Sequence, residues 1–215
     1  MRLGIYGGSF NPVHRLHVRC ANLLVYLNLV DRVYLVPTHN NRLEPNKEVI
    51  SSHHRMAMLA LAIEDCPPNI LISDFDVRHE NNQSCKTISY FSNKYPEDEL
   101  YFVLGVDSFN SLFKWQSWEY IARTTQLVVF SRDDIPVNKE VLKAPEMMKP
   151  PIIISTATNT DEDFPVASST IRQLLRTENV DLSSLRKYFP NKNVLDYVRK
   201  HGLYSTLGER MFFWF

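Results

Sequence analysis

The 215-residue sequence has few cysteines, no long apolar run and no excess of either charge. Its three cysteines, Cys20, Cys66 and Cys85, are odd in number and widely spaced, which predicts reduced thiols of a cytoplasmic protein rather than disulfides or a zinc site. No apolar stretch reaches the roughly 20 residues of a membrane helix, so we expect neither a membrane segment nor a signal peptide. Lys plus Arg and Asp plus Glu both number 24, which argues against a nucleic-acid partner.

Glycine is also scarce, at six residues, yet two glycines are adjacent near the start of the chain. An apolar run at 3–6 predicts a buried strand that ends at Gly7-Gly8, and a helical pattern begins near His14. A strand, a glycine turn and a helix start form a phosphate cradle, because backbone N–H groups can approach a ligand there. His14 and His17 share one face of the predicted helix. We expect both to donate hydrogen bonds to phosphate oxygens.

Apolar strands alternate with helical patterns, which predicts an α/β fold with a doubly wound, mainly parallel, Rossmann-like sheet. We expect strands at 3–6, 33–36, 70–75, 100–104, 127–130 and 152–154. The length suits a single domain at 1–204, followed by an apolar tail at 205–215. Because ligands bind beyond the carboxyl ends of such strands, the segments that follow them should converge on one cleft.

One further segment carries polar groups that suit a nucleotide site. Ser168 and Ser169 stand at a predicted helix start with Arg172 one turn later, which predicts a second anion site. A serine N-cap with a surface arginine is the simpler interpretation of this segment alone.

In the helix expected at 55–63, the apolar spacing predicts that Met56, Leu59 and Ile63 face inward.

Together these segments resemble the nicotinate/nicotinamide mononucleotide adenylyltransferase family of the nucleotidyltransferase superfamily. GGSFNP at 7–12 followed by HRLH at 14–17 is similar to the pattern GGxF(D/N)PxHxGH, with Leu16 in place of a glycine. VASSTIR at 166–172 looks like the ISSTxIR motif, with Ala167 in place of the first serine. GVDSFNSLFKWQSW at 105–118 resembles the G-x-D-S-x(n)-W segment of this family, and HGLY at 201–204 resembles its ending.

The resemblance implies transfer of AMP from ATP to nicotinate or nicotinamide mononucleotide, which forms a dinucleotide and pyrophosphate in NAD biosynthesis. Mg²⁺ would be held mainly by the ATP phosphates, and no residue is assigned to a metal. The implied catalytic residues are His14, His17 and Arg172. The residues implied for ATP binding are Gly7, Gly8, Ser9, Phe10, Lys47, Gly105, Asp107, Ser168 and Ser169. Those implied for the mononucleotide are Lys86, Thr87 and Trp115.

Within that set, the resemblance places Asp107 on the adenosine ribose and Trp115 on the pyridine ring. Lys86 would favour a carboxylate on that ring over a neutral amide, so we expect the nicotinate form with some amide activity. Two other functions remain open at this point. One is another small-molecule adenylyltransferase, such as a phosphopantetheine adenylyltransferase, and the other is an inactive nucleotide-binding homologue. The apolar tail favours docking, either on its own domain or on a neighbouring subunit, and docking between subunits would make the protein a homo-oligomer.

Overall fold

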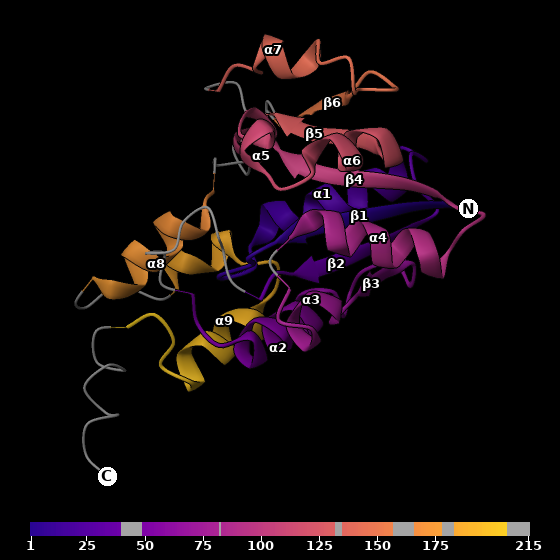
Figure 1. The fold of residues 1–215 in the computed structure, drawn as a ribbon. Helices are drawn as coiled ribbons and strands as arrows, with labels where there is room; N and C mark the ends of the chain where they lie inside the picture. Colours follow the sequence, from indigo (N-terminus) through magenta and orange to yellow (C-terminus); the bar gives the residue numbers. More distant parts are fainter. Residues whose placement is uncertain (40–48, 82, 132–134, 157–165, 178–182, 206–215) are drawn as a thin grey trace.

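The computed structural model describes residues 1–39, 49–81, 83–131, 135–156, 166–177 and 183–205. In these residues six parallel strands form one sheet in the order β3-β2-β1-β4-β5-β6 (Figure 1). The strands are β1 (Arg2–Gly8), β2 (Arg32–Pro37), β3 (Ile70–Ile72), β4 (Glu99–Gly105), β5 (Gln126–Ser131) and β6 (Ile152–Ser155). The strand order reverses between β1 and β4, which confirms the predicted doubly wound, Rossmann-like sheet.

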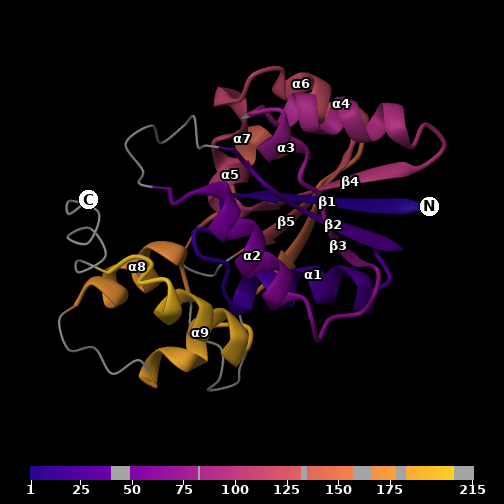
Figure 2. The same cartoon turned by 90° about the horizontal axis from the view of Figure 1, so that it is seen from below.

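Helices cover both faces of this sheet (Figure 2). They are α1 (Arg15–Tyr26), α2 (Ser52–Ala62), α3 (Phe75–Arg78), α4 (Ser84–Lys94), α5 (Val106–Asn110), α6 (Trp118–Thr124), α7 (Lys139–Leu142), α8 (Ser168–Arg176) and α9 (Lys192–Lys200), with 3₁₀ turns η1 (Leu112–Lys114) and η2 (Ser184–Tyr188). Buried residues of α1, α2, α8 and α9 belong to one core, and those of α4, α5, α6 and α7 to the other. None of the helices described here is both long and apolar enough to cross a membrane.

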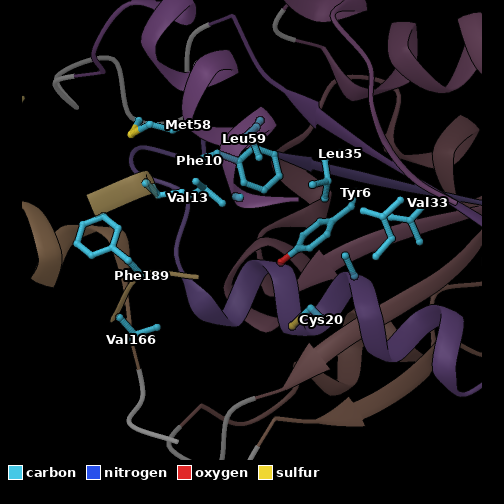
Figure 3. Packing of buried hydrophobic residues seen from close by; sticks show 14 of the residues in the cluster. Tyr6, Phe10, Val13, Cys20, Val33, Leu35, Met58, Leu59, Val166 and Phe189 are labelled. Carbon is cyan, nitrogen blue, oxygen red and sulfur yellow. The ribbon is translucent and has the colours of Figure 1, made fainter. Parts of the chain in front are cut away.

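Successive strand residues alternate between the two cores. Leu35 and Val128 belong to the core with α1 and α2, part of which Figure 3 shows, whereas Val36 and Val129 belong to the core on the opposite face. This alternation is the period of an extended strand buried on both faces. Both faces of the sheet are therefore occupied, and the carboxyl ends of the strands are left to carry the functional loops.

The expected glycine turn lies later in the chain than predicted. β1 continues through Gly7 and Gly8, and the chain turns at Phe10, whose φ of 45° is in the left-handed region. A Cβ on Gly8 would lie 3.2 Å from the Phe10 ring, so Gly8 is needed for the close approach of that ring. The strand expected at 70–75 is also shorter, because it ends at Ile72 and Phe75 begins α3.

Two predictions fall outside the described residues. Lys47 lies in the segment 40–48, and the apolar tail lies beyond Ser205. The assignment of Lys47 to ATP and the docking of the tail therefore stay predictions.

Candidate active site

A cavity of about 700 Å³ lies at the carboxyl ends of the strands. That volume is in the usual range for a small-molecule site. Its wall includes residues from the ends of β1, β4 and β5 and from the starts of α1, α4, α5 and α8. The predicted site residues in the wall are Gly7, Gly8, Ser9, His14, His17, Thr87, Gly105, Asp107, Trp115, Ser168 and Ser169. The fold thus brings residues of the segments 7–17, 105–118 and 166–172 to one cavity.

The two histidines stand at the start of α1 with their rings stacked. His14 is the N-cap residue and is 4% exposed, and the ring centroids of His14 and His17 lie 3.6 Å apart at 20°. The backbone N–H of His14 donates to Nδ1 of His17 at 3.2 Å. Because Nδ1 accepts this bond, the proton of neutral His17 is on Nε2. Burial lowers the pKa of His17 to about 3, so at neutral pH the ring is an uncharged donor.

Phe10 occupies a different place from the one predicted for an ATP-binding residue. Its side chain is 1% exposed and packs in the core with Met58 and Leu59, outside the cavity wall (Figure 3). The ring meets Tyr6 edge-on at 5.7 Å and His17 at 5.0 Å. We therefore assign Phe10 a supporting role, in which its ring fixes the orientation of the His17 imidazole.

The start of α8 is bonded to the loop between β1 and α1. Ser168 Oγ donates to the carbonyl of Pro12 at 2.9 Å, and Arg172 Nη1 donates to the carbonyl of Asn11 at 2.7 Å. Arg172 does not line the cavity, so the structure places this predicted catalytic residue behind the loop. Ser169 lines the cavity and is exposed, and it stands with the first backbone N–H groups of α8. These N–H groups have no partner within the helix and favour an anion.

Arg55 holds the same loop from α2. Its side chain is fully buried, and its guanidinium donates to three carbonyl oxygens: Ser9 at 2.8 Å, His39 at 3.0 Å and Ile50 at 3.1 Å. In the described part of the chain it forms no ion pair, and burial lowers the pKa of Arg55. The spacing of apolar residues in this helix predicts other inward-facing side chains, and apolar spacing carries no signal for a buried arginine.

The C-terminal ending also reaches the loop. Tyr204, which has a φ of 65°, donates its hydroxyl to Oδ1 of Asn11 at 2.8 Å. The backbone N–H of Ile50 donates to the same oxygen at 3.4 Å. The HGLY segment is thus part of the support of the candidate site.

The segment after β4 supplies the far side of the cavity. Asp107 is exposed in the first turn of α5, and Trp115 is half-buried with its ring edge-on to Phe102 at 6.2 Å and 73°. Lys114 also lines the cavity, although the sequence analysis did not single it out. Lys86, which it did single out, is exposed on α4 and is not a wall residue.

Thr87 belongs to a buried polar cluster. Its hydroxyl donates to Oδ1 of Asp76 at 2.7 Å, and Nδ2 of Asn81 donates to the same oxygen at 2.8 Å. Burial raises the pKa of Asp76, and this carboxyl group also lines the cavity. Sequence reasoning missed Asp76, because an acidic residue in a polar connection carries no signal of its own. The cluster fixes the start of α4 against the site.

Comparison with known proteins identifies the family. Residues 5–174 match the family model described as cytidylyltransferase-like. The chain belongs to the cytidylyltransferase-like family. A relative from Syntrophotalea carbinolica, named probable nicotinate-nucleotide adenylyltransferase, is 31% identical over 96% of this chain and 98% of its own length. A Mycoplasma genitalium relative, named probable nicotinate-nucleotide adenylyltransferase/Ap4A hydrolase, is 34% identical over 64% of this chain, which spans only 39% of that relative.

A solved structure has the same fold as this chain. Plasmodium falciparum nicotinic acid mononucleotide adenylyltransferase complexed with NaAD matches with a TM-score of 0.77 at 23% identity, over 94% of this chain and 97% of that one.

The two departures from the superfamily motifs, Leu16 and Ala167, both lie in the cavity wall of the present chain. Any effect of these two side chains on ligands would therefore act directly in the site.

Proposed function

We propose that this cytidylyltransferase-like protein transfers AMP from ATP to nicotinate mononucleotide, with release of pyrophosphate. The observation that carries the proposal is the single cavity wall, which holds His14 and His17, the start of α8, and Asp107 with Trp115. A full-length relative is named for this activity, which supports the same conclusion.

The chemistry requires positioning and charge stabilisation rather than proton abstraction. An oxygen of the mononucleotide phosphate forms a bond to the α-phosphorus of ATP, while the bond from that phosphorus to the bridging oxygen breaks. Because the attacking phosphate is already an anion at neutral pH, no general base is needed. Negative charge grows on the departing pyrophosphate, and donors placed around it lower the barrier.

Each element of the wall supplies a distinct part of this task. The neutral Nε2–H of His17 donates to an oxygen of the reacting phosphates. Ser169 and the first N–H groups of α8 bind the departing phosphates, helped by the partial positive charge of a nine-residue helix. Asp107 accepts from the adenosine ribose hydroxyls, and the indole of Trp115 stacks on the cationic pyridine ring.

ATP enters this scheme as its Mg²⁺ complex, which is a substrate. The described residues contain no group of three or more His, Cys, Asp or Glu side chains placed to hold a metal ion. The scheme assigns Mg²⁺ no protein ligand, because this ion usually keeps several waters and is held largely by substrate phosphates. The cytoplasmic location and the homo-oligomer stay predictions.

The direct test measures pyrophosphate release from ATP with each candidate acceptor. We expect release with nicotinate mononucleotide, weaker release with nicotinamide mononucleotide, and none with 4′-phosphopantetheine. Release with phosphopantetheine alone would identify a different adenylyltransferase. ATP binding without pyrophosphate release for any acceptor would identify an inactive homologue. In that case Leu16→Gly and Ala167→Ser are the first substitutions with which to restore activity.

Trp115 provides a second test of the same proposal. Replacing it with alanine should weaken mononucleotide binding by about 1–3 kcal/mol, the scale of stacking between a base and an aromatic ring. ATP binding should change little, because the contacts proposed for ATP, at the starts of α1 and α8 and at Asp107, do not include this indole. Isothermal titration with each ligand measures both quantities.

Trp118 is the matched control for this substitution. It packs against Phe113 with ring centroids 4.7 Å apart and is not a wall residue. Trp118→Ala should therefore leave the affinity for both ligands unchanged. If Trp115→Ala weakened ATP and mononucleotide binding equally, its indole would be a core residue and not a stacking platform.

A further inference from the structure

The cavity wall contains a buried carboxyl group that forms no ion pair with a lysine or arginine of the described residues. This group belongs to Asp76, which is 3% exposed. Arg78, two residues later, pairs instead with Asp74 on the surface. Burial raises the pKa of Asp76, and its hydrogen bonds and the imidazole of His79 offset only part of that effect. The ionised acid is therefore only partly compensated by the described side chains.

The protein donors reach one of the two oxygens of this carboxyl group. Thr87 Oγ1 donates to Oδ1 of Asp76 at 2.7 Å, and Asn81 Nδ2 donates to the same oxygen at 2.8 Å. Asn81 is itself held, because its Oδ1 accepts from the N–H of Gln83 at 3.0 Å. Among the described residues no donor reaches Oδ2, so this is the oxygen that remains for a ligand in the cavity.

Asp76 lies on the face of the sheet that also carries Trp115 (Figure 2). Its neighbour Phe75 stacks on Tyr90 of α4 with the ring centroids 4.0 Å apart, and Tyr90 and Trp115 pack against the same core. The helices α1 and α8, whose starts we assign to the phosphates, pack on the opposite face. The carboxyl group is thus on the side of the cavity that the proposed function gives to the pyridine ring.

We propose that ionised Asp76 is the counter-ion of the cationic pyridine ring, and that it selects mononucleotides with an oxidised ring over the uncharged 1,4-dihydro form. This inference rests on the proposed function, which puts that ring at Trp115. An indole face and a carboxylate both attract a cation, so the two groups act on the ring together. A dihydropyridine ring has a similar size but no charge, and it would leave the buried carboxylate uncompensated.

The test measures the affinity for the oxidised and 1,4-dihydro forms of nicotinate mononucleotide, by titration calorimetry without ATP, in wild type, Asp76→Asn and Asp74→Asn. Asparagine keeps an acceptor for Thr87 and Asn81 and removes the charge. We expect Asp76→Asn to lower the affinity for the oxidised form by about tenfold, and for the dihydro form by less than about twofold. Nicotinamide mononucleotide, whose ring carries no carboxylate, should give the same ranking of its two forms.

Asp74 provides the matched control from the same part of the chain. Its side chain is 43% exposed and pairs with Arg78. Asp74→Asn removes the same charge two residues away, so it should match wild type for both forms of the ligand.

The pH dependence separates a counter-ion from a structural group. A cationic ligand lowers the pKa of Asp76 in the complex relative to the free protein, so binding releases protons. The affinity of wild type for the oxidised form is therefore full above the pKa of the free protein and falls as the pH falls below it. Asp76→Asn lacks this dependence, so the difference between the two proteins isolates Asp76 from the titration of the ligand phosphate. Without ligand, Asp76→Asn should unfold at the same temperature as wild type or higher, because it removes an uncompensated buried charge.

Three results would overturn the inference. Equal losses for the oxidised and dihydro forms in Asp76→Asn would mean that Asp76 contacts a part that both forms share, or supports the fold of the site. No loss for either form would mean that the carboxyl group meets no ring charge. A loss in Asp74→Asn equal to that in Asp76→Asn would mean that only the net charge of this region matters.

Failure of the proposed function itself would look different. Wild type would then release no pyrophosphate from ATP with any oxidised mononucleotide. The titrations do not depend on turnover. A preference for the oxidised ring that is lost in Asp76→Asn would then keep the counter-ion and remove only the reaction.

Discussion

Replacing His17 with alanine should lower kcat by at least about a hundredfold, in the range of a removed oxyanion-hole donor. The substitution removes an Nε2–H that is fixed by two contacts: the His14 N–H on Nδ1 and the edge of Phe10 on the ring. A donor that is already oriented needs no reorganisation when charge grows on the phosphates. The affinity for the mononucleotide should change little, because the contact strengthens only in the transition state. Steady-state kinetics and titration calorimetry measure the two quantities.

The pH dependence of turnover distinguishes a neutral donor from a cation. Burial lowers the pKa of His17 to about 3, so the neutral form, and with it this donor, is fully present at any pH well above that value. We therefore expect His17 to add no inflection to the kcat profile between about pH 5 and 8. His17→Gln, which keeps an N–H donor, should recover part of the lost kcat. Turnover that falls as pH rises through about 6.5 in wild type, but not in His17→Gln, would show that His17 acts as a cation.

Replacing Arg55 with alanine should lower the free energy of unfolding by at least about 2 kcal/mol. The change removes the donor shared by the carbonyls of Ser9, His39 and Ile50, which lie in three part-buried segments after β1, after β2 and before α2. Each unsatisfied buried acceptor costs about 1–3 kcal/mol, and the relief from burying a charge offsets part of the sum. Urea denaturation at constant m-value measures the difference.

Arg78 offers the control for this experiment. Its Nε pairs with Asp74 Oδ2 at 2.5 Å on the surface, with 74% of the Arg78 side chain exposed. Arg78→Ala should therefore change the free energy of unfolding by less than about 1 kcal/mol. Similar losses in the two variants would show that the three carbonyl contacts of Arg55 contribute no more than a surface ion pair.

The sequence predicts the order of elements and the meeting of the motifs well, for a physical reason. In a parallel sheet the carboxyl ends of the strands meet at one edge, so any residue placed directly after a strand is placed near the others. The same cavity contains Gly105 and Asp107 from the end of β4 and His14 from the segment after β1, because the carboxyl ends of these strands lie at one edge of the sheet. The predictions about these positions needed only the strand boundaries, which the apolar runs fix to within a few residues.

The sequence does not predict which side chains of a helix face the site. In α2 the apolar spacing favours Met56, Leu59 and Ile63. Leu59 is buried and Ile63 packs half-buried against the core, whereas the other buried residues are Arg55, Met58 and Ala62. Two neighbouring faces of α2 fit the same spacing of apolar residues. Which face packs against the core depends on residues at distant positions in the chain. Apolar spacing does not predict the contacts of Arg55, because all three acceptors are backbone carbonyls, which every residue carries alike.

The same limit applies to the lysines and to Thr87. Lys86 adjoins a predicted site residue but is exposed outside the wall, because adjacent helical residues point about 100° apart. Lys114 lies beside Trp115 at the end of a 3₁₀ turn, where the backbone geometry differs. Asp76 reaches Thr87 from α3, an element that the sequence analysis did not predict.

The contact between Tyr204 and Asn11 has a consequence for biosynthesis, because 193 positions separate the two residues. A ribosome exposes Asn11 long before its tyrosine partner, so in that interval the nascent chain must hold the first motif without this support. Pairings of such long range form late in folding, since the cost of closing the chain comes before the gain from the contact. The strands can therefore pair before this contact forms, and the loop gains the support of Tyr204 only after the HGLY ending has been made. A translation product that stops short of the HGLY ending would keep the strands of the fold and lack a fully organised phosphate loop.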